Sequence, residues 1–412
     1  MLKNYVKLAL RVLARRKFFT FISLFGISLT LVVLMVAAAI LDNVFASRPP
    51  ESRFDRVLSV SRVSISGNRA IMTGGAGYRF LDKYLRNLPG AEATSIASDS
   101  SAVTMYHEGR KIETHIRRTD GVYWRILNFR FLEGGPFTEQ DNQNANFVAV
   151  ITDDMRAKLF GGPALNRTFV VEGQTFRVVG VVPAVAITRL AAFSEIWAPV
   201  RTYRTRDYEK GVVGSFSGLV LARDRADFPR LRNEFDKRLQ GFVFDDPKMF
   251  HKIDAGLDTR FEAFARFMLG GTFERNRAAA MRTILFVLAL LFVTLPTINL
   301  ISINLSRIME RAAEIGVRKA FGASSPSLIG QFVVENVVLT LIGGLIGFVL
   351  SLCALAALTR AEVVPYAVFD INFRIFLYGM LIAALFGVFS GVYPAWRMSR
   401  MQAVNALRGG AL

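Results

Sequence analysis

Long apolar stretches without any charged residue occur near both ends of the chain, and a longer mixed sequence separates them. One stretch covers residues 18–41, and three more cover residues 283–305, 336–359 and 375–396. Each has between 22 and 24 residues, whereas a helix needs about 20 apolar residues to cross the hydrocarbon core of a bilayer. The pattern predicts a membrane α-helical protein with four transmembrane helices and a large domain inserted between the first two.

Basic residues border these stretches at alternate ends. They precede the first stretch, lie between the second and third, and follow the fourth: Lys3, Lys7, Arg11, Arg15, Arg16, Lys17, Arg307, Arg311, Arg318, Lys319, Arg397, Arg400 and Arg408. The short outer loop 360–374 instead balances two basic residues with two acids. Because basic loops stay on the cytoplasmic side, we predict a cytoplasmic N-terminal segment (1–17), a cytoplasmic tail (397–412) and an extracytoplasmic domain (42–282). The first stretch exceeds the core of a signal peptide, about 7–15 residues, and is interpreted as a retained anchor.

The sequence of the extracytoplasmic domain alternates strand-like and helix-like segments without the regular spacing of βαβ units. Residues 102–106 and 111–117 are strand-like and flank a turn, which predicts a hairpin. Thr152 or Asp153 can cap a short helix that ends at Gly161-Gly162. We therefore predict an α+β domain.

Two subdomains are expected in this domain, residues 43–90 with 191–258, and residues 91–190. Near the end of the domain, apolar residues recur on one side of a helical segment: Phe261, Phe264, Phe267 and Met268. This stripe could face a twin subunit, the membrane surface or its own domain. The sequence leaves these three possibilities open.

Residues that commonly carry catalysis or bind metals form no recognisable motif. The three histidines, His107, His115 and His251, lack metal-ligand spacing, and Cys353 is the single cysteine. The sequence contains no GxxxxGK[ST] phosphate-binding loop. We predict a non-catalytic membrane subunit with no metal or cofactor on this chain, so that ATP, if it drives the protein, binds to another chain.

The charge balance is strongly basic, with 51 Lys and Arg residues against 33 Asp and Glu residues and a net charge of +18. Such a balance can indicate nucleic-acid binding, but neither a zinc-finger spacing nor an RNA-binding signature accompanies it. Many of the basic residues instead border the apolar stretches. We attribute part of the charge to contact with membrane lipid and exclude nucleic acid as a partner.

A proline and several glycines interrupt the apolar stretches. Pro296 lies in the middle of the second stretch and lacks an amide donor, so we expect a kink there. Gly343, Gly344 and Gly347 lie in the third stretch, and the spacing of Gly343 and Gly347 permits two helices to approach closely. Glycine is also frequent in membrane helices generally, so both interpretations stay open.

The most informative motif lies in the cytoplasmic loop between the second and third stretches, residues 306–325: Glu310, Arg311, Glu314, Ile315, Gly316, Val317, Arg318, Lys319, Ala320 and Gly322. Glu314 and Arg318 are four residues apart and would stabilise a helix by about 0.2–0.5 kcal/mol. Gly322 favours the end of that helix, and Pro326 favours the start of the third transmembrane helix, 326–359. The loop either fixes topology by its charge or forms a docking helix that receives a push from a soluble partner.

This motif resembles the signature of the MacB/FtsX-type ABC transporter permeases. The end of the chain, residues 393–397 followed by 403–408, resembles the same family. In the extracytoplasmic domain, residues 131–141 resemble a MacB-like segment in which Gly135 replaces an arginine, and residues 150–162 and 176–182 continue the similarity. The resemblance extends from about residue 5 to residue 408.

The resemblance implies a permease subunit of the bacterial inner membrane that works as a homo- or heterodimer with a second permease subunit. Its partners would be cytoplasmic ABC ATPase subunits that bind ATP and Mg²⁺, and a periplasmic adaptor and an outer-membrane channel are further candidates. The loop 306–325 would act as the coupling helix that passes ATP-driven motion to the periplasmic domain. Few ionisable groups lie in the apolar stretches, which agrees with transmission of motion rather than a polar path through the membrane.

Two functions follow from the resemblance. The first is export or extraction of an envelope substrate such as a peptide, toxin, lipid or lipoprotein, and the large two-part outer domain favours it. The alternative is an FtsX-like transmembrane signal transmitter that controls cell-wall hydrolases without transport. The sequence does not identify the substrate.

Overall fold

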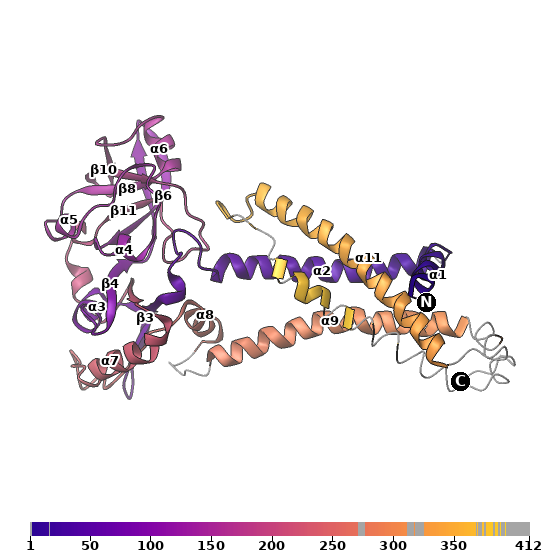
Figure 1. Cartoon of the computed structure of the whole chain (residues 1–412). Helices are drawn as coiled ribbons and strands as arrows, with labels where there is room; N and C mark the ends of the chain where they lie inside the picture. Colours follow the sequence, from indigo (N-terminus) through magenta and orange to yellow (C-terminus); the bar gives the residue numbers. More distant parts are fainter. Residues whose placement is uncertain are drawn as a thin grey trace. The chain divides into compact units, whose positions relative to one another are not determined.

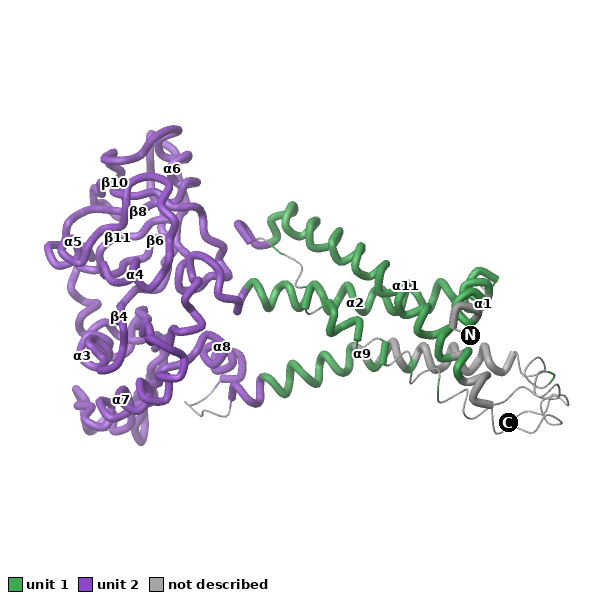
Figure 2. Tube along the Cα trace, viewed as in Figure 1, with its two compact units in different colours: residues 1–43, 282–363, 368–412 green, residues 44–281, 364–367 purple. Residues whose placement is uncertain are grey.

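The computed structural model describes residues 2–15, 17–270, 277–310, 317, 325–367, 369, 373–374, 376–381, 384–385, 388 and 392. The chain divides into two compact units (Figure 2). The helical unit comprises residues 1–43, 282–363 and 368–412, and the globular unit comprises residues 44–281 and 364–367. Two of the boundaries between the units fall inside continuous helices, and the other two flank residues 364–367.

The long helices of the helical unit include α1 (Leu2–Arg15), α2 (Lys17–Phe45), α9 (Arg277–Glu310) and α11 (Ser325–Arg360) (Figure 1). The unit boundary falls within α2, after Asn43, and within α9, after Met281. Because the first three apolar stretches contain no charge to favour an earlier end, each lies inside one helix. The predicted N-terminal segment 1–17 is helical in its described part, as α1.

Among the described residues, two helical segments are long and apolar enough to cross a membrane, α2 and Val333–Arg360 of α11. Helix α2 has 29 residues, which at 1.5 Å per residue is about 44 Å. Of the predicted fourth helix, 375–396, the structure describes residues 376–381, 384–385, 388 and 392, all helical. The predicted tail, 397–412, lies outside the described residues.

Helices α2 and α11 pack closely in the helical unit. Leu13, Ile27, Leu31 and Leu339 form a buried cluster between them and α1. A Cβ atom added at Gly343 would lie 2.9 Å from Ile27 Cγ2, and one at Gly347 would lie 3.2 Å from the Ser28 Cα. Two glycines of α11 therefore face α2 at a closer approach than most side chains make without a shift of their neighbours.

A mixed sheet of fourteen strands forms the described core of the globular unit, in the order β14-β2-β3-β13-β4-β6-β11-β8-β10-β7, with β1 on β13, β12 on β3, β5 on β6 and β9 on β10. The strands are β1 (Val57–Val60), β2 (Val63–Ser66), β3 (Ile71–Ala76), β4 (Ala91–Ser98), β5 (Ser101–His107), β6 (Arg110–Thr119), β7 (Glu133–Gly134), β8 (Val148–Thr152), β9 (Thr168–Val171), β10 (Gln174–Val182), β11 (Ile196–Pro199), β12 (Val213–Gly214), β13 (Phe216–Ala222) and β14 (Lys252–Ala255). Strand pairs β6–β11 and β8–β10 are parallel and the other pairs antiparallel.

Short helices connect the strands: α3 (Tyr78–Tyr84), α4 (Tyr123–Ile126), α5 (Glu139–Gln143), α6 (Asp153–Phe160), α7 (Phe228–Gln240), α8 (Arg260–Leu269) and the 3₁₀ turns η1 (Phe54–Arg56), η2 (Val200–Thr202), η3 (Asp207–Glu209) and η4 (Arg225–Asp227). Strands and helices do not alternate regularly, so the unit is α+β, as the sequence predicts. Its apolar side chains form three buried clusters, around Phe80 and Phe235, around Trp124 and Trp197, and around Phe169 and Phe176.

Local sequence explains several of these elements. The β5–β6 turn places Glu108 and Gly109 at φ +48° and +74°, which is the geometry of a tight hairpin turn and suits glycine. Helix α6 begins where Thr152 Oγ1 accepts a hydrogen bond from Met155 N (3.2 Å) and ends at Gly161 with φ +62°. Helix α8 begins with a capping box between Thr259 and Glu262.

Candidate functional site

Most residues of the predicted coupling motif lie outside the described residues: Arg311, Glu314, Ile315, Gly316, Arg318, Lys319, Ala320 and Gly322. Glu310 is the last residue of α9, and Val317 is helical and exposed. Pro296 lies within α9. A Cβ added at Gly344 would clash with the side chain of Met380. The motif itself therefore stays a prediction.

The globular unit has a different cluster, at the point where the chain enters it from α2 and leaves it toward α9. We name it the entry–exit cluster and define it by the residues Val44, Phe45, Ala46, Glu51, Arg189, Ala191, Ala192, Arg260, Phe261 and Phe264. All of these residues belong to the globular unit. They join the last turn of α2, the loop 183–195 and α8.

Glu51 is the centre of the entry–exit cluster and is completely buried. Its Oε2 forms an ion pair with Arg260 Nη2 and lies 3.7 Å from Arg189 Nη1. Its Oε1 accepts hydrogen bonds from the backbone amides of Ala191 (3.2 Å) and Ala192 (3.1 Å). A carboxylate can remain in a buried position when charges and donors compensate it on both oxygens, and Glu51 has both.

The two arginines also hold the end of α2 directly. Arg189 Nη1 donates to the carbonyl oxygen of Ala46 (2.5 Å), and Arg260 Nη1 donates to that of Val44 (2.9 Å). Positive groups are favourable at a helix C-terminus, where carbonyl groups lack intrahelical partners. The sequence places arginines from two distant segments there, so the last turn of α2 is attached to both the loop 183–195 and α8.

Aromatic packing adds to this attachment. The Phe45 ring meets the rings of Phe261 and Phe264 edge to face, with centroids 5.4 and 5.1 Å apart. Such pairs contribute about 0.5–1.5 kcal/mol beyond their buried area. Two residues of the apolar stripe on α8 thus face their own domain, while Phe267 and Met268 remain exposed.

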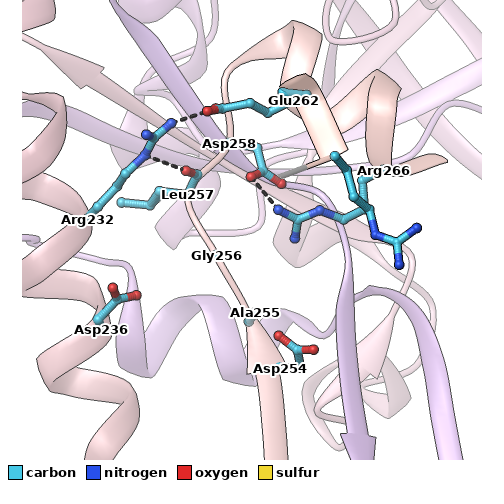
Figure 3. Close-up of a pocket in the computed structure, with 11 residues that line it drawn as sticks. Arg232, Asp236, Asp254, Ala255, Gly256, Leu257, Asp258, Glu262 and Arg266 are labelled. Atoms are coloured by element: carbon cyan, nitrogen blue, oxygen red, sulfur yellow. Dashed lines mark hydrogen bonds and ion pairs between the residues drawn. The ribbon is translucent and has the colours of Figure 1, made fainter. Parts of the chain in front are cut away.

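A polar cavity of about 270 Å³ lies beside the entry–exit cluster, between α7, β14, α8 and the first residues of α9 (Figure 3). Arg232 from α7 donates to Glu262 Oε2 (2.5 Å) and to the Leu257 carbonyl (3.0 Å). Asp258 Oδ1 accepts from Arg266 Nη2 (2.6 Å). These contacts join opposite charges from α7, the loop before α8, and α8 itself. They connect α7 to α8.

The Asp258 carboxyl has an unusual proton affinity. Burial raises its pKa to about 7, and the nearby Arg266 guanidinium opposes this effect. Desolvation disfavours the charged form of a carboxyl group. The Asp258 carboxyl in this cavity should therefore gain or lose its negative charge near neutral pH.

Buried ion pairs and hydrogen bonds hold the entry–exit cluster together. Among the residues that the structure describes, no group of three or more His, Cys, Asp or Glu side chains could hold a metal ion. The cluster attaches the last turn of α2 to the loop 183–195 and to α8 through buried ion pairs. Sequence reasoning missed this cluster because Arg189 lies 138 residues and Arg260 lies 209 residues after Glu51 in the chain. No local pattern relates the three residues.

The fold and the site define a membrane protein in which long apolar helices continue into an α+β domain outside the membrane. Two family models cover most of the chain: the MacB-like periplasmic core domain matches residues 20–238 and the FtsX-like permease C-terminal domain matches residues 286–403. The chain belongs to this family of ABC transporter permeases, whose members are inner-membrane proteins with a periplasmic domain.

The chain is also similar to individual proteins. The ABC transporter permease YknZ of Bacillus subtilis (strain 168) is 26% identical over 79% of this chain and 77% of its own length. The macrolide export ATP-binding/permease protein MacB of Bdellovibrio bacteriovorus is 27% identical over 66% of this chain, which spans 40% of that protein. The crystal structure of the periplasmic region of MacB from Actinobacillus actinomycetemcomitans is 15% identical, with a TM-score of 0.37 over 53% of this chain and 94% of that one.

Proposed function

We propose that this permease transmits the ATP-driven motion of a separate ATPase across the membrane to its periplasmic globular unit, and thereby exports or extracts an envelope substrate. The observation that supports this most strongly is the attachment of the end of α2 to the globular unit through Glu51, Arg189 and Arg260. The membrane topology belongs to the same proposal: four transmembrane helices, with both termini and the loop 306–325 in the cytoplasm.

The physical argument concerns what happens when α2 moves. A continuous helix transfers displacement along its axis, because each turn is held by backbone hydrogen bonds. If its end were attached by exposed contacts alone, each would contribute about 0–1 kcal/mol and could open during the movement. The buried cluster instead is held by several contacts at once: two ion pairs of Glu51, four hydrogen bonds made by Glu51 and the two arginines, and two ring contacts of Phe45. The entry–exit cluster should therefore stay closed while α2 tilts or slides.

Partners follow from what the chain contains and what it lacks. The sequence has no phosphate-binding loop, so we place ATP and Mg²⁺ on cytoplasmic ABC ATPase subunits and no cofactor on this chain. The family implies a dimer of permease subunits. A periplasmic adaptor and an outer-membrane channel are partners that the export function would require.

The substrate class is a peptide, toxin, lipid or lipoprotein of the envelope. The Bdellovibrio relative is a macrolide export protein by name, which supports outward transport as the direction. The alternative is an FtsX-like signal transmitter. Co-purification distinguishes them: an adaptor or outer-membrane channel supports transport, whereas a peptidoglycan hydrolase supports signalling.

The coupling helix provides the direct test. The double variant Glu314→Ala/Arg318→Ala should insert into the membrane normally but lose stimulation of the ATPase. The control replaces by alanine an exposed ion pair of the globular unit, Lys111 and Glu113, whose charged atoms are 2.6 Å apart. This control should retain full stimulation of the ATPase. Full stimulation in the Glu314/Arg318 variant would remove the loop from the mechanism.

A further inference from the structure

The loop 183–195, which connects β10 to β11, exposes two large apolar side chains at the end of a membrane helix. Leu190 is 74% exposed and Ile187 is 48% exposed. An exposed leucine alone needs no explanation. Here, however, the neighbouring residue, Arg189, donates a hydrogen bond to Ala46, directly after the last residue of α2.

The loop is held rigidly although it has no regular secondary structure. Arg117 donates to the carbonyl oxygens of Leu190 (2.8 Å) and Phe193 (3.2 Å). Tyr123 Oη donates to Ala191 O (2.8 Å), and Glu51 accepts from the amides that follow. Because buried groups fix the backbone from Leu190 to Phe193, the loop backbone loses little entropy on contact.

A second element exposes apolar residues beside the same turn of α2. Helix α8 packs on Phe45 through Phe261 and Phe264. One turn further along α8, Phe267 is 71% exposed and Met268 is 52% exposed. The loop and α8 thus both carry exposed apolar side chains close to the end of α2.

The depth of this site follows from the length of the helix. The charge-free stretch of α2 ends at Leu41, and Phe45 is four residues, about 6 Å, further along the axis. The headgroup region is about 5–8 Å thick on each side of the hydrocarbon core. If α2 spans the membrane as proposed above, the turn that binds Arg189 lies at the level of the lipid headgroups.

We propose that Ile187 and Leu190, together with Phe267 and Met268, insert into the headgroup layer of the outer leaflet and rest the globular unit on the lipid surface. Apolar side chains leave water favourably when they enter the boundary between headgroups and acyl chains. The occupant is phospholipid, because α2 is continuous from its apolar stretch to Phe45 and both exposed segments contact that end of the helix. This contact would let the globular unit follow the membrane surface when α2 moves.

The test measures the accessibility of single spin labels in the full chain, reconstituted in vesicles of phosphatidylethanolamine and phosphatidylglycerol. A Cys353→Ser background removes the single cysteine. Labels are placed at Leu190→Cys, at Val243→Cys as the matched control, and at Val33→Cys within α2. Val243 is 69% exposed but lies beside α3, where its amide contacts Tyr84 Oη.

For each label, the measured quantity is the ratio of its collision rate with oxygen to its collision rate with a water-soluble nickel complex. We expect this ratio to be several-fold higher at Leu190 than at Val243. Equal nickel accessibility at Leu190 and Val243, with Val33 in lipid, would overturn this inference but leave the membrane helix intact. Nickel access at Val33 would overturn the span and the inference together. Low accessibility of Leu190 to both reagents, together with dipolar broadening, would show that the loop contacts the twin subunit and would also overturn this inference. Ile187→Cys repeats the measurement should the Leu190 variant not fold.

Discussion

Replacing Glu51 by glutamine tests whether the entry–exit cluster holds the globular unit together. The substitution keeps the side-chain shape and an acceptor for the amides of Ala191 and Ala192, but it removes the negative charge from between Arg189 and Arg260. Both arginine side chains are largely buried, 7% and 18% exposed. Removing one partner of such a pair costs about 3–5 kcal/mol, because the remaining charge stays desolvated.

For a folded unit of this size, each kcal/mol lowers the Tm by about 2–4 °C, so Glu51→Gln should lower it by roughly 6–20 °C. The assay is thermal unfolding of the full chain in detergent, followed by the fluorescence of the buried Trp124 and Trp197. A Trp396→Phe background removes the third tryptophan. Glu113→Gln, at an exposed pair, is the control and should leave the Tm unchanged. A Glu51→Gln shift no larger than that of Glu113→Gln would refute the reasoning.

Three further predictions follow. Burial raises the pKa of Asp258 to about 7, so its protonation stabilises the folded state below about pH 4, and this stability is lost as pH rises through about 7. In urea unfolding, the wild type should therefore lose stability relative to Asp258→Asn across this pH range, and parallel pH curves would contradict the prediction. Gly347→Ala should destabilise the helical unit by about 1–3 kcal/mol in the same denaturation assay, because the new Cβ meets the Ser28 backbone. The control Gly330→Ala, at a position with open space around it, should be neutral or stabilising. In a double-mutant cycle, Glu51→Gln and Arg260→Gln should be non-additive by at least about 1 kcal/mol; additive losses would show that the two residues act independently.

Local patterns in the sequence predict much of the fold because they depend on neighbouring residues. The charge-free stretch 18–41 lies inside α2, and the strand–turn–strand pattern around residue 109 corresponds to the β5–β6 hairpin. Thr152 and Gly161 are the caps of α6, as their residue types indicate. In each case one short-range preference, hydrophobic length, turn geometry or capping, decides the structure.

The order of the strands and the entry–exit cluster could not be predicted in this way. Strand β13 lies between β3 and β4, although more than a hundred residues separate it from both in the sequence. Glu51 has no sequence neighbour that reveals its partners, and it reads as an ordinary surface acid between Pro50 and Ser52. Only the tertiary fold brings Arg189 and Arg260 to Glu51, where the three side chains form buried ion pairs.

The central claim, that ATP-driven motion reaches the globular unit through the coupling loop, is tested most directly by a distance measurement. Spin labels at Tyr106→Cys, an exposed position on β5, in the Cys353→Ser background report the separation of the two globular units in a reconstituted dimer with its ATPase. We predict that ATP shifts this distance by several ångströms and that Glu314→Ala/Arg318→Ala abolishes the shift. A distance that does not respond to ATP, or that responds equally in the double variant, would contradict the account.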